Sequence, residues 1–462
     1  MTNAAKQYID LFTSCREAID SHSCEVMNAH RDDAFAVVSA SDFPTRKVED
    51  YKYTNMQEWM APDLGLNINR LRIPVSPYDA FKCDVPNLST LLYFVVNDTL
   101  YTDATPRVEL PEGVVVDSIC HAAATHPELL ARYYNHLATS RRSVSGPHAD
   151  KNAAPVDVMT ALNTLLAQDG LLIYVPDGVQ MDRTLQVVNI LRADVGMMVN
   201  RRVLIIAGRQ ASVKVLFCDH TADDQDFLTT QVTEIYCGED SDVEVYGLEE
   251  THLRNTLIAN TYIEQQRSSR LHHSLITLHN GRTRQMTRLV FAGEGAECWL
   301  NGGVIADKTQ HVDNNTLIDH AVAHCDSHEL YKYVLNDDSV GAFAGKVLVR
   351  EGAQKTASEE RNQNLSSTST ARMYTQPMLE IYADDVKCSH GSTVGQLNDK
   401  ALFYMQQRGI SLAEARLLLQ TAFINEVIDN IKLEPLRDRL HYLVDKRFRG
   451  ELNKCEGCKM CK

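Results

Sequence analysis

The chain has 462 residues, of which 44% are hydrophobic, and a formal net charge of −15 at pH 7. This length and composition predict roughly three domains with a large buried core. The acidic charge argues against sequence-independent nucleic-acid binding and against docking on an anionic membrane, because both need a basic surface.

The N-terminus and the cysteines indicate the compartment. The first 15 residues lack a basic segment followed by a long apolar run, and no stretch approaches 18 consecutive apolar residues. We therefore expect no signal peptide, no transmembrane helix and a cytoplasmic location, where cysteines stay reduced. Nine of the 12 cysteines are scattered singly, and most of these are expected to be small buried hydrophobes: Cys15, Cys24, Cys83, Cys120, Cys218, Cys237, Cys298, Cys325 and Cys388.

Residues 1–165 form a first region that is mixed and largely helical. Segments 3–19, 127–139 and 157–170 place apolar residues near helical spacing, and Gly170 is positioned to end the last of these helices. Between them, STLLYFVVNDTLYTDA predicts a strand, a turn at Asn97-Asp98 and a second strand.

Residues 166–395 form a second region of short β-rich runs separated by Gly, Asp, Asn and Ser clusters. A turn followed by a short strand recurs at positions 212, 242, 270, 297 and 328. A strand-rich repeat with a period of about 30 residues and no helices favours the stacked coils of a β-solenoid. A large β-sandwich is the alternative, because it also has short strands at regular spacing.

Residues 396–450 form a third, helical region, and residues 451–462 a Cys-rich tail. Segment 398–409 predicts a helix ended by Gly409, and Ser411-x-x-Glu414 is a capping box that starts the next helix. A terminal helical unit of this size either caps a solenoid or presents a face to a partner, and both interpretations stay open.

Nucleotide-binding and hydrolase motifs are missing from the sequence. It contains no G-x-x-x-x-G-K-[ST], no G-x-G-x-x-G, no H-E-x-x-H and no G-x-S-x-G. We therefore do not expect the chain to hydrolyse ATP itself.

Two segments, one within the β-rich region and one in the C-terminal tail, carry potential metal ligands. His320, His324 and His328 are spaced four apart, which would suit zinc on a helix, but the segment lies within the β repeat, so solvated or hydrogen-bonded histidines are favoured. The tail contains a C-x-x-C-x-x-C run, which either binds zinc or iron with a ligand from a partner or is a reduced, flexible terminus. Its residues are Cys455, Cys458 and Cys461.

Segment 382–395, YADDVKCSHGSTVG, predicts a strand. Side chains alternate along a strand, so Cys388 and His390 are expected to share a face with Tyr382, Asp384 and Val386. The residues alone leave three interpretations open: two ligands for a soft metal, a nucleophile with its base, or a buried cysteine beside a hydrogen-bonded histidine.

Residues 382–427 resemble the C-terminal signature of the SufB/SufD family of iron–sulfur cluster assembly subunits. Segments 43–56 (FPTRKVEDYKYTNM), 161–178 and 310–365 support the resemblance, which covers most of the chain. Within the family, the run from Lys387 to Gly391 fits the SufD type better than the SufB type.

The resemblance implies a fold and partners. It implies a helical N-terminal region, a right-handed parallel β-helix core and a C-terminal helical domain. Proteins of this type pair with a SufB-like paralogue through their β-helices and bind a SufC-like ATPase through their C-terminal helices. We therefore expect a non-catalytic subunit with no tightly bound cofactor, which shares a transient iron–sulfur cluster with the SufB-like partner.

The resemblance also implies site residues. The family's interface cysteine and histidine map onto Cys388 and His390, and the histidine is implicated at the cluster-assembly site together with SufB residues. The ATPase-docking helices map onto about 399–430, with Leu402, Phe403, Ala415, Leu418, Leu419 and Phe423 as candidate contacts.

Alternative functions remain at this point. They are a SufB-like subunit, a metal or cluster carrier that uses the tail cysteines, and a β-helix enzyme such as a polysaccharide lyase. Because a β-helix ends in an open strand edge, a homodimer is also plausible when the partner is absent. The segment 139–155 departs from the family pattern and is expected to be a loop.

Overall fold

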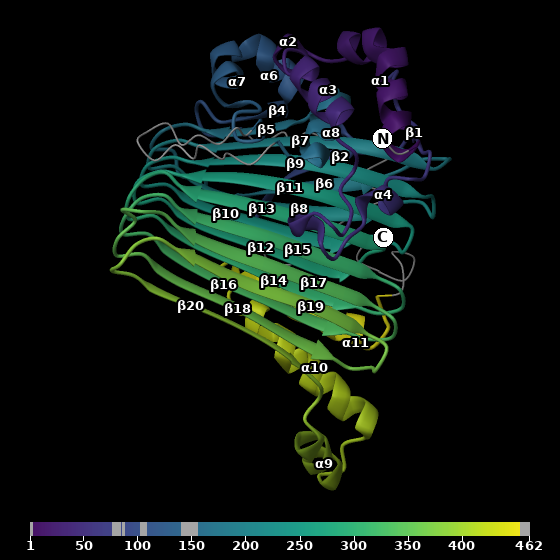
Figure 1. The fold of residues 1–462 in the computed structure, drawn as a ribbon, viewed down its shortest axis with the longest axis vertical. Coiled ribbons are helices and arrows are strands. Elements are labelled where there is room, and N and C mark those ends of the chain that lie inside the picture. The colour runs from purple at the N-terminus through teal and green to yellow at the C-terminus, as the bar shows by residue number, and fades with distance from the viewer. Residues whose placement is uncertain (1–2, 76–84, 86–87, 102–108, 140–155, 453–462) are drawn as a thin grey trace.

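The computed structural model describes the chain except for residues 1–2, 76–84, 86–87, 102–108, 140–155 and 453–462. Its centre is a parallel β-solenoid, in which the chain alternates between two facing sheets (Figure 1). The predicted fold class, mainly β with a solenoid core and helices at both ends, is confirmed. The β-sandwich alternative is wrong, because each long strand pairs in parallel with the strand one coil away.

The first sheet and the second sheet each contain strands from every coil. The first sheet contains β4 (Val115–Ser118), β5 (Leu171–Val175), β7 (Met197–Ala207), β9 (Phe227–Cys237), β11 (Asn255–Gln265), β13 (Arg282–Phe291), β15 (His311–His320), β17 (Val340–Val349) and β19 (Arg372–Ile381), and β1 (Gly65–Leu66) pairs with β7. The second sheet contains β3 (Thr99–Leu100), β2 (Thr90–Val96), β6 (Thr184–Leu191), β8 (Ser212–Thr221), β10 (Asp242–Glu250), β12 (Arg270–His279), β14 (Glu297–Ala306), β16 (Asp326–Leu335), β18 (Ala357–Ser366) and β20 (Lys387–Gly395).

The sequence repeat matches the strand register of the second sheet. Positions 212, 242, 270 and 297 are paired from coil to coil. The fifth predicted position is wrong by two residues, because Glu297 pairs with Asp326 and His328 pairs with Trp299. A shift of two residues leaves each side chain on its predicted face, since the strand period is two.

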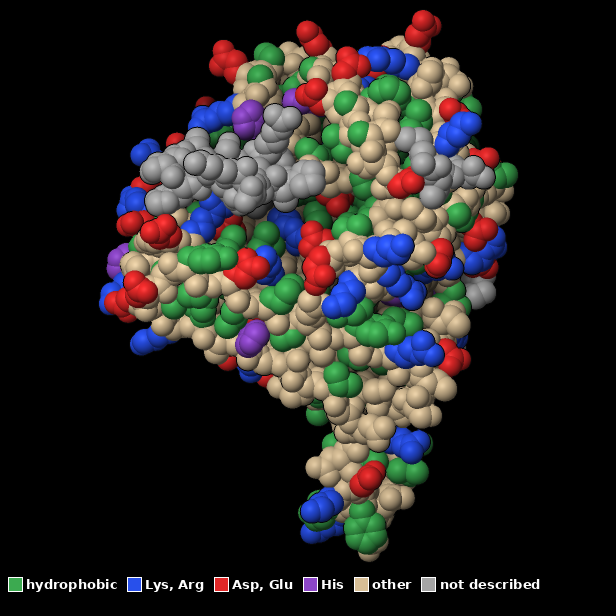
Figure 2. Space-filling model, viewed as in Figure 1, with side chains coloured by type: hydrophobic (Ala, Val, Ile, Leu, Met, Phe, Trp, Pro, Cys, Tyr) green, Lys and Arg blue, Asp and Glu red, His purple; other side chains and the backbone are tan. Residues whose placement is uncertain are grey.

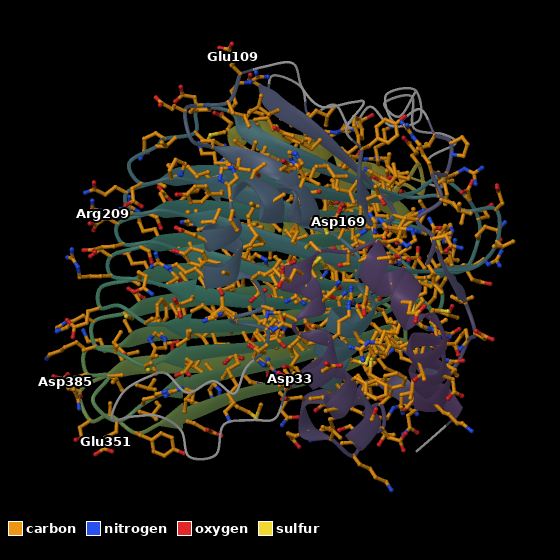
Figure 3. The ribbon with its side chains drawn as sticks, turned by 90° about the horizontal axis from the view of Figure 1, so that it is seen from above. Asp33, Glu109, Asp169, Arg209, Glu351 and Asp385 are labelled. Atoms are coloured by element: carbon orange, nitrogen blue, oxygen red, sulfur yellow. The ribbon has the colours of Figure 1, made fainter. Side chains whose placement is uncertain are left out.

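Turns from the first sheet to the second stack along one edge of the solenoid. Most of them hold one residue in the left-handed conformation, as at Ser268 (φ 54°) and His324 (φ 62°). Figure 3 shows Arg209, Glu351 and Asp385 along this edge. Because His324 occupies such a turn, between β15 and β16, the histidines spaced four apart share no helical face.

Most of the N-terminal helices lie over one end of the solenoid, and the short helix at Met56–Trp59 lies further along it, against His311 of β15 (Figure 1). The N-terminal helices are α1 (Asn3–Ser21), α2 (Glu25–Asn28), α3 (Arg31–Ala40), the 3₁₀-helix η1 (Glu49–Tyr51), α4 (Met56–Trp59), α6 (Ile119–Thr125), α7 (Pro127–Tyr133) and α8 (Val158–Leu166). The strand–turn–strand prediction is confirmed by β2 and β3, with Asn97 at φ 56° in the turn.

Gly170 has a different role from the predicted one. Helix α8 ends at Leu166, before Gly170 is reached. At Gly170 a Cβ atom would lie 2.5 Å from the Arg202 carbonyl oxygen on β7. The glycine is therefore needed because two backbone segments approach closely, and not to end the helix.

The C-terminal helices are α9 (Asp399–Gln407), α10 (Leu412–Ile428) and α11 (Glu434–Phe448). Ser411 Oγ accepts a hydrogen bond from the Glu414 amide at 3.2 Å, as the capping box predicts, and Gly409 has a φ of 86° after α9. Apolar residues of α11 and of the second half of α10 pack on the outer face of the second sheet. Among the described helices, none is long and apolar enough to cross a membrane.

Candidate functional site

The C-terminal end of the solenoid is open. In the described part of the chain, β19 pairs only with β17 and β20 only with β18. At the opposite end, the short antiparallel strands β3 and β4 cover the outermost strands of the two sheets. An uncovered edge strand presents a row of backbone donors and acceptors, so the open end is suited to pairing with another strand.

Apolar side chains accompany the open edge. Tyr382 is 64% exposed and Val394 is 52% exposed, and Tyr374 and Ile381 are also exposed. By contrast, every residue of β16, which belongs to an earlier coil, is buried or partly buried. Exposed apolar side chains next to a free strand edge are typical of an interaction surface.

Cys388 lies in β20 and is half-buried. Its side chain packs with Leu379 against a small buried cluster that includes Val347 and Ala383. Burial raises the pKa of the Cys388 thiol, which favours the neutral thiol in the isolated chain.

Buried hydroxyls extend from Cys388 into the solenoid. Cys388 pairs in register with Ser358. Ser327 Oγ donates a hydrogen bond to Ser358 Oγ at 2.8 Å, and His320 Nε2 lies 2.9 Å from Ser327 Oγ. Burial lowers the pKa of His320 to about 3, so this imidazole is neutral at pH 7.

His390 is exposed and stands in front of two buried carboxyl groups. It pairs in register with Glu360, which pairs with Glu329. Burial raises the pKa of Glu360 to about 9, with a further contribution from the charge of Glu329, and burial raises the pKa of Glu329 to about 7. Neither carboxyl oxygen of Glu360 has a hydrogen-bond partner among the described residues.

The structure corrects the predicted strand over 382–395. β20 begins at Lys387, and residues 382–386 connect β19 to β20, with the Asp385 carbonyl accepting a hydrogen bond from the Lys355 amide at 2.6 Å. Tyr382 and Asp384 therefore do not share the strand face of Cys388 and His390. The Asp384-Asp385 pair favours a turn, and this preference outweighs the extended pattern around it.

Metal-ligating groups are sparse in the described residues. They contain no group of three or more His, Cys, Asp or Glu that could hold a metal ion. Cys388 and His390 offer two ligand atoms, so a metal or cluster at this edge needs further ligands from outside the described residues. The predicted ligands Cys455, Cys458 and Cys461 lie outside the described residues.

Residues 44–56 form a strap across the outer face of the first sheet, which reasoning from the sequence missed. Tyr53 stacks on Tyr374 of β19 with ring centroids 4.9 Å apart, and Tyr53 Oη donates to Gln376 Oε1 at 2.8 Å. Higher on the same face, the buried Arg284 lies over the Tyr51 ring at 4.1 Å. The strap therefore links the N-terminal region to the last coil, and local spacing holds no signal for a contact between residues 323 apart.

An arm projects from the solenoid at its C-terminal side and consists of α9 and the first half of α10 (Figures 1 and 2). Figure 2 shows hydrophobic side chains at the tip of this arm. Phe403 is 63% exposed and Tyr404 is 59% exposed, and Leu412 and Leu418 are also exposed.

The six candidate docking residues do not form one accessible face. Phe403 and Leu418 are exposed, Leu419 and Phe423 are partly buried, and Leu402 and Ala415 are buried. Phe423 packs against the cluster on the second sheet, and its ring lies 4.4 Å from Lys332 Nζ. The apolar pattern of α10 thus combines residues that hold the helix to the solenoid with residues that remain exposed.

Comparisons with known proteins agree on one family. A profile described as "SUF system FeS cluster assembly, SufBD core domain" matches residues 189–423, and a profile of the "SufBD protein N-terminal region" matches residues 2–187.

Three relatives illustrate the similarity. An iron–sulfur cluster assembly SufBD family protein of Synechocystis sp. is 27% identical over 433 residues, which cover 90% of each chain. The iron–sulfur cluster assembly protein SufD of Escherichia coli is 34% identical over 167 residues, which cover 36% of this chain and 40% of that protein. SufD of Bacillus subtilis is 24% identical over 429 residues, which cover 90% of this chain and 92% of that protein.

Proposed function

The chain belongs to the SufBD family of the SUF iron–sulfur cluster assembly system, and from this premise we propose that it is a non-catalytic, SufD-type subunit of a cluster-assembly complex. In this proposal it pairs with a SufB-like paralogue, binds a SufC-like ATPase and acts in the cytoplasm. The observation that carries the proposal is the open end of the solenoid, where Cys388 and His390 lie on a free edge strand.

The SufB-like partner would pair with the open edge. β20 offers unpaired backbone groups, and Val394 and Tyr382 add apolar area that becomes buried in such a complex. When the paralogue is absent, two copies of this chain would pair through the same edge, so we expect a homodimer under those conditions.

The nascent cluster would form where this edge meets the partner. Cys388 and His390 supply a sulfur and a nitrogen ligand, and the partner supplies the remaining ligands. The cluster is cargo and is not a resident cofactor of this chain. Glu360 and Glu329 behind His390 are able to take up or release protons as the charge at the edge changes, because burial has raised their pKa values to about 9 and about 7.

The ATPase would bind the projecting arm. Phe403, Tyr404 and Leu418 give this arm an apolar surface without a covering element among the described residues. The remainder of α10 is fixed to the solenoid, for example by a 2.6 Å hydrogen bond from Gln420 Nε2 to Ser367 Oγ. A movement of the ATPase would therefore be transmitted to the solenoid through a continuous helix.

Co-expression with the SufB-like and ATPase proteins of the same organism, followed by anaerobic purification, tests the proposal. We expect a stable complex of the three proteins. Phe403→Asp should remove the ATPase and retain the paralogue, whereas Tyr442→Asp, at an exposed apolar residue of α11 away from the arm, should retain both. A chain that elutes without either protein would contradict the proposed function.

The cluster-assembly role has its own test in the intact complex. His390→Ala should leave the complex assembled and lower the iron and acid-labile sulfide that it carries by about 10-fold or more, because a ligand has been removed. Ser389→Ala is the matched control, since Ser389 is also exposed on β20 and points to the opposite face. Equal cluster content in both variants would remove His390 from the assembly site.

A further inference from the structure

A chamber of about 60 Å³ lies inside the solenoid, between the two sheets, in the coils from β8 to β13. Its walls include Phe217, Ile235 and Val245, which belong to the central hydrophobic core. Gly247 of β10 and Ala259 of β11 face the chamber from opposite sheets, and both retain exposed surface although they lie in the middle of the solenoid. No part of the proposed cluster-assembly function uses this chamber.

Small residues create the chamber. Gly247, Leu275 and Gly302 stand in one register column of the second sheet. At Gly302 the Tyr331 ring takes the available space, since a Cβ atom would lie 2.1 Å from Tyr331 Cδ1. At Gly247 the one described atom within 4 Å of such a Cβ is Leu275 Cδ2. No large side chain therefore fills the interior at Gly247, and the chamber remains there.

Polar side chains line the chamber, and two of their buried atoms lack a hydrogen-bond partner. His273 is 3% exposed, and its Nδ1 has no partner among the described residues. The same holds for Gln285 Oε1. Burial lowers the pKa of His273 to about 4, so its imidazole is neutral at pH 7. Buried polar atoms are nearly always satisfied by protein or by ordered water, so these two atoms indicate water in the chamber.

Glu249 is a third group that needs a partner from the chamber. Its carboxyl oxygens accept hydrogen bonds from Thr283 Oγ1 at 2.7 Å and from Thr277 Oγ1 at 3.1 Å, so the side chain joins both sheets. Burial raises the pKa of Glu249 to about 8, so the carboxyl group carries a proton at pH 7. Both oxygens already accept from hydroxyls, and the carboxyl O–H therefore needs an acceptor of its own. A water molecule in the chamber supplies that acceptor.

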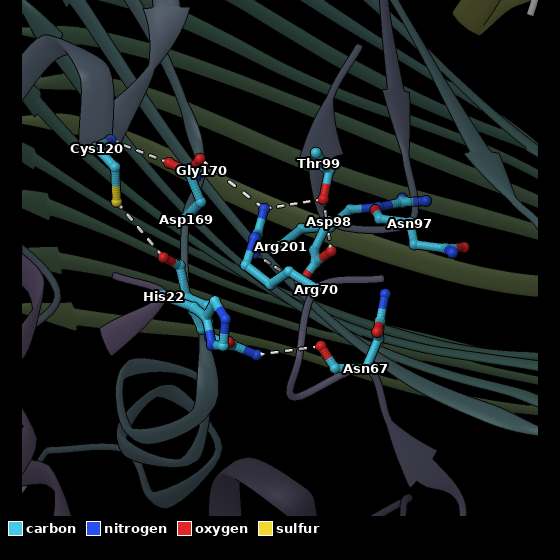
Figure 4. Close-up of polar contacts among 12 residues, drawn as sticks. His22, Asn67, Arg70, Asn97, Asp98, Thr99, Cys120, Asp169, Gly170 and Arg201 are labelled. Carbon is cyan, nitrogen blue, oxygen red and sulfur yellow. Dashed lines mark hydrogen bonds and ion pairs between the residues drawn. The ribbon is translucent and has the colours of Figure 1, made fainter. Parts of the chain in front are cut away.

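A second, smaller chamber of about 10 Å³ lies on the N-terminal side of the first. Arg201 lines it and is 4% exposed. Its Nε donates to the Asn97 carbonyl at 2.9 Å and its Nη1 to Asp219 Oδ1 at 2.5 Å (Figure 4). Arg201 Nη2 has no hydrogen-bond partner among the described residues. Asp219 also lines the first chamber, so the Arg201–Asp219 ion pair stands between the two chambers.

The two volumes fit water and not a larger ligand. A water molecule occupies about 30 Å³ in the liquid, and a cavity needs at least about 10–15 Å³ to hold one. The first chamber therefore has room for about two water molecules and the second for one. Drug-sized ligands require pockets of about 300 Å³ or more.

We propose that the interior of the solenoid is a binding site for a cluster of ordered water molecules, held in the first chamber by Glu249, His273 and Gln285 and in the second by Arg201. The cluster completes the hydrogen bonds that the core side chains lack, and it links polar groups of the two sheets. The site is independent of the open end of the solenoid and of the proposed complex, so the failure of one proposal leaves the other standing.

A high-resolution crystal structure of the full-length chain tests the site without any substitution. We expect water peaks within hydrogen-bond distance of Gln285 Oε1, His273 Nδ1 and Arg201 Nη2. The same crystals under xenon pressure should show no xenon in the first chamber, because xenon enters dry apolar cavities. Xenon in the first chamber, or no water peak there when surface waters are resolved, would overturn the proposal.

Deuteron relaxation dispersion of water counts the long-lived internal water molecules of the full-length chain in solution. Ala259→Leu places a larger side chain in the first chamber and should lower the count by about two. Gln285→Met, which replaces the unpartnered acceptor by an apolar side chain of similar length, should lower it by about one. Ala61→Leu is the matched control, because Ala61 is an exposed alanine outside the two sheets, and it should leave the count unchanged. Equal counts in Ala259→Leu, Gln285→Met and the unsubstituted chain would also overturn the proposal.

Discussion

The two ends of the solenoid are built differently although the strands between them repeat one pattern. At the N-terminal end, buried Glu234 accepts hydrogen bonds from the amides of Asn135 and Leu137, both at 2.8 Å, and from Arg202 at 3.0 Å. At the C-terminal end, equally buried Glu360 has no hydrogen-bond partner among the described residues. The N-terminal end is covered by the chain's own residues, whereas among the described residues the C-terminal end keeps two unpaired strand edges and a buried carboxyl group without a hydrogen-bond partner.

Substituting one buried glutamate at each end should give the largest difference in unfolding free energy between the two ends. Glu234→Gln should lower the free energy of unfolding by about 3–5 kcal/mol, because it leaves the buried Arg202 without a charged partner. Glu360→Gln removes no hydrogen bond to a described residue and should not destabilise the chain at neutral pH. Denaturant unfolding followed by circular dichroism measures both, and equal losses would contradict the difference between the ends.

Substituting one isoleucine at each end of the solenoid compares how tightly the two ends are packed. Ile119 of α6 is 0% exposed and Ile381 at the end of β19 is 40% exposed. Ile119→Ala should cost about 2–5 kcal/mol of unfolding free energy, because it leaves a cavity under the N-terminal helices. Ile381→Ala should stay within about 0.5 kcal/mol of the unsubstituted chain, because the side chain is only partly packed. A thermal melt of each variant checks this, and a large loss for Ile381→Ala would mean that the last coil is packed as tightly as the others.

The pH dependence of stability distinguishes Glu360 from a solvated glutamate. Its folded-state pKa of about 9 lies above the unfolded value of 4.5, so the folded chain holds a proton that the unfolded chain releases. The stability due to the neutral carboxyl is therefore complete below pH 4.5 and is lost as the pH rises towards 9. Glu360→Gln stays neutral and should be more stable than the unsubstituted chain by about 1–3 kcal/mol at pH 9.

Unfolding at pH 6 and pH 9 measures this effect of Glu360. Glu359→Gln is the control, because the neighbouring Glu359 is 47% exposed and its substitution should not change the pH dependence. If Glu360→Gln and the unsubstituted chain lose the same stability between these pH values, Glu360 is already charged in the folded chain at pH 6.

The repeating part of the fold was predictable from the sequence because its signals are local. Turn residues and alternating strands recur about every 30 residues, and this spacing alone fixes the register of four coils. The error of two residues at His328 misplaces β16 relative to β14. The predicted repeat stops at β16, so the alignment of Glu329 with Glu360, which lie 31 residues apart, was not predicted.

The remaining features depend on contacts that no local pattern reports. The sequence pattern predicts that Gly170 ends a helix, but a glycine is needed there because the backbone of β7 lies close beside it. The strap from Tyr53 to Tyr374 joins the N-terminal region to the last coil, and Cys120 contacts Met27 although 93 residues separate them. Likewise, the spacing of apolar residues in α10 cannot separate Ala415, which is buried, from Leu418, which is exposed.

The smallest expected effect on stability is the one that tests the open end most directly. Val394→Asp changes an exposed residue of β20 and should alter the unfolding free energy by no more than about 0.5 kcal/mol. The same charge at the edge should prevent strand pairing, because an unpaired carboxylate would be buried in the interface. We therefore expect light scattering to show a monomer for Val394→Asp and co-expression to recover no SufB-like partner, while the ATPase still binds the arm. A partner that is retained at full yield would mean that the chain pairs through another surface and that the open edge is completed by something else.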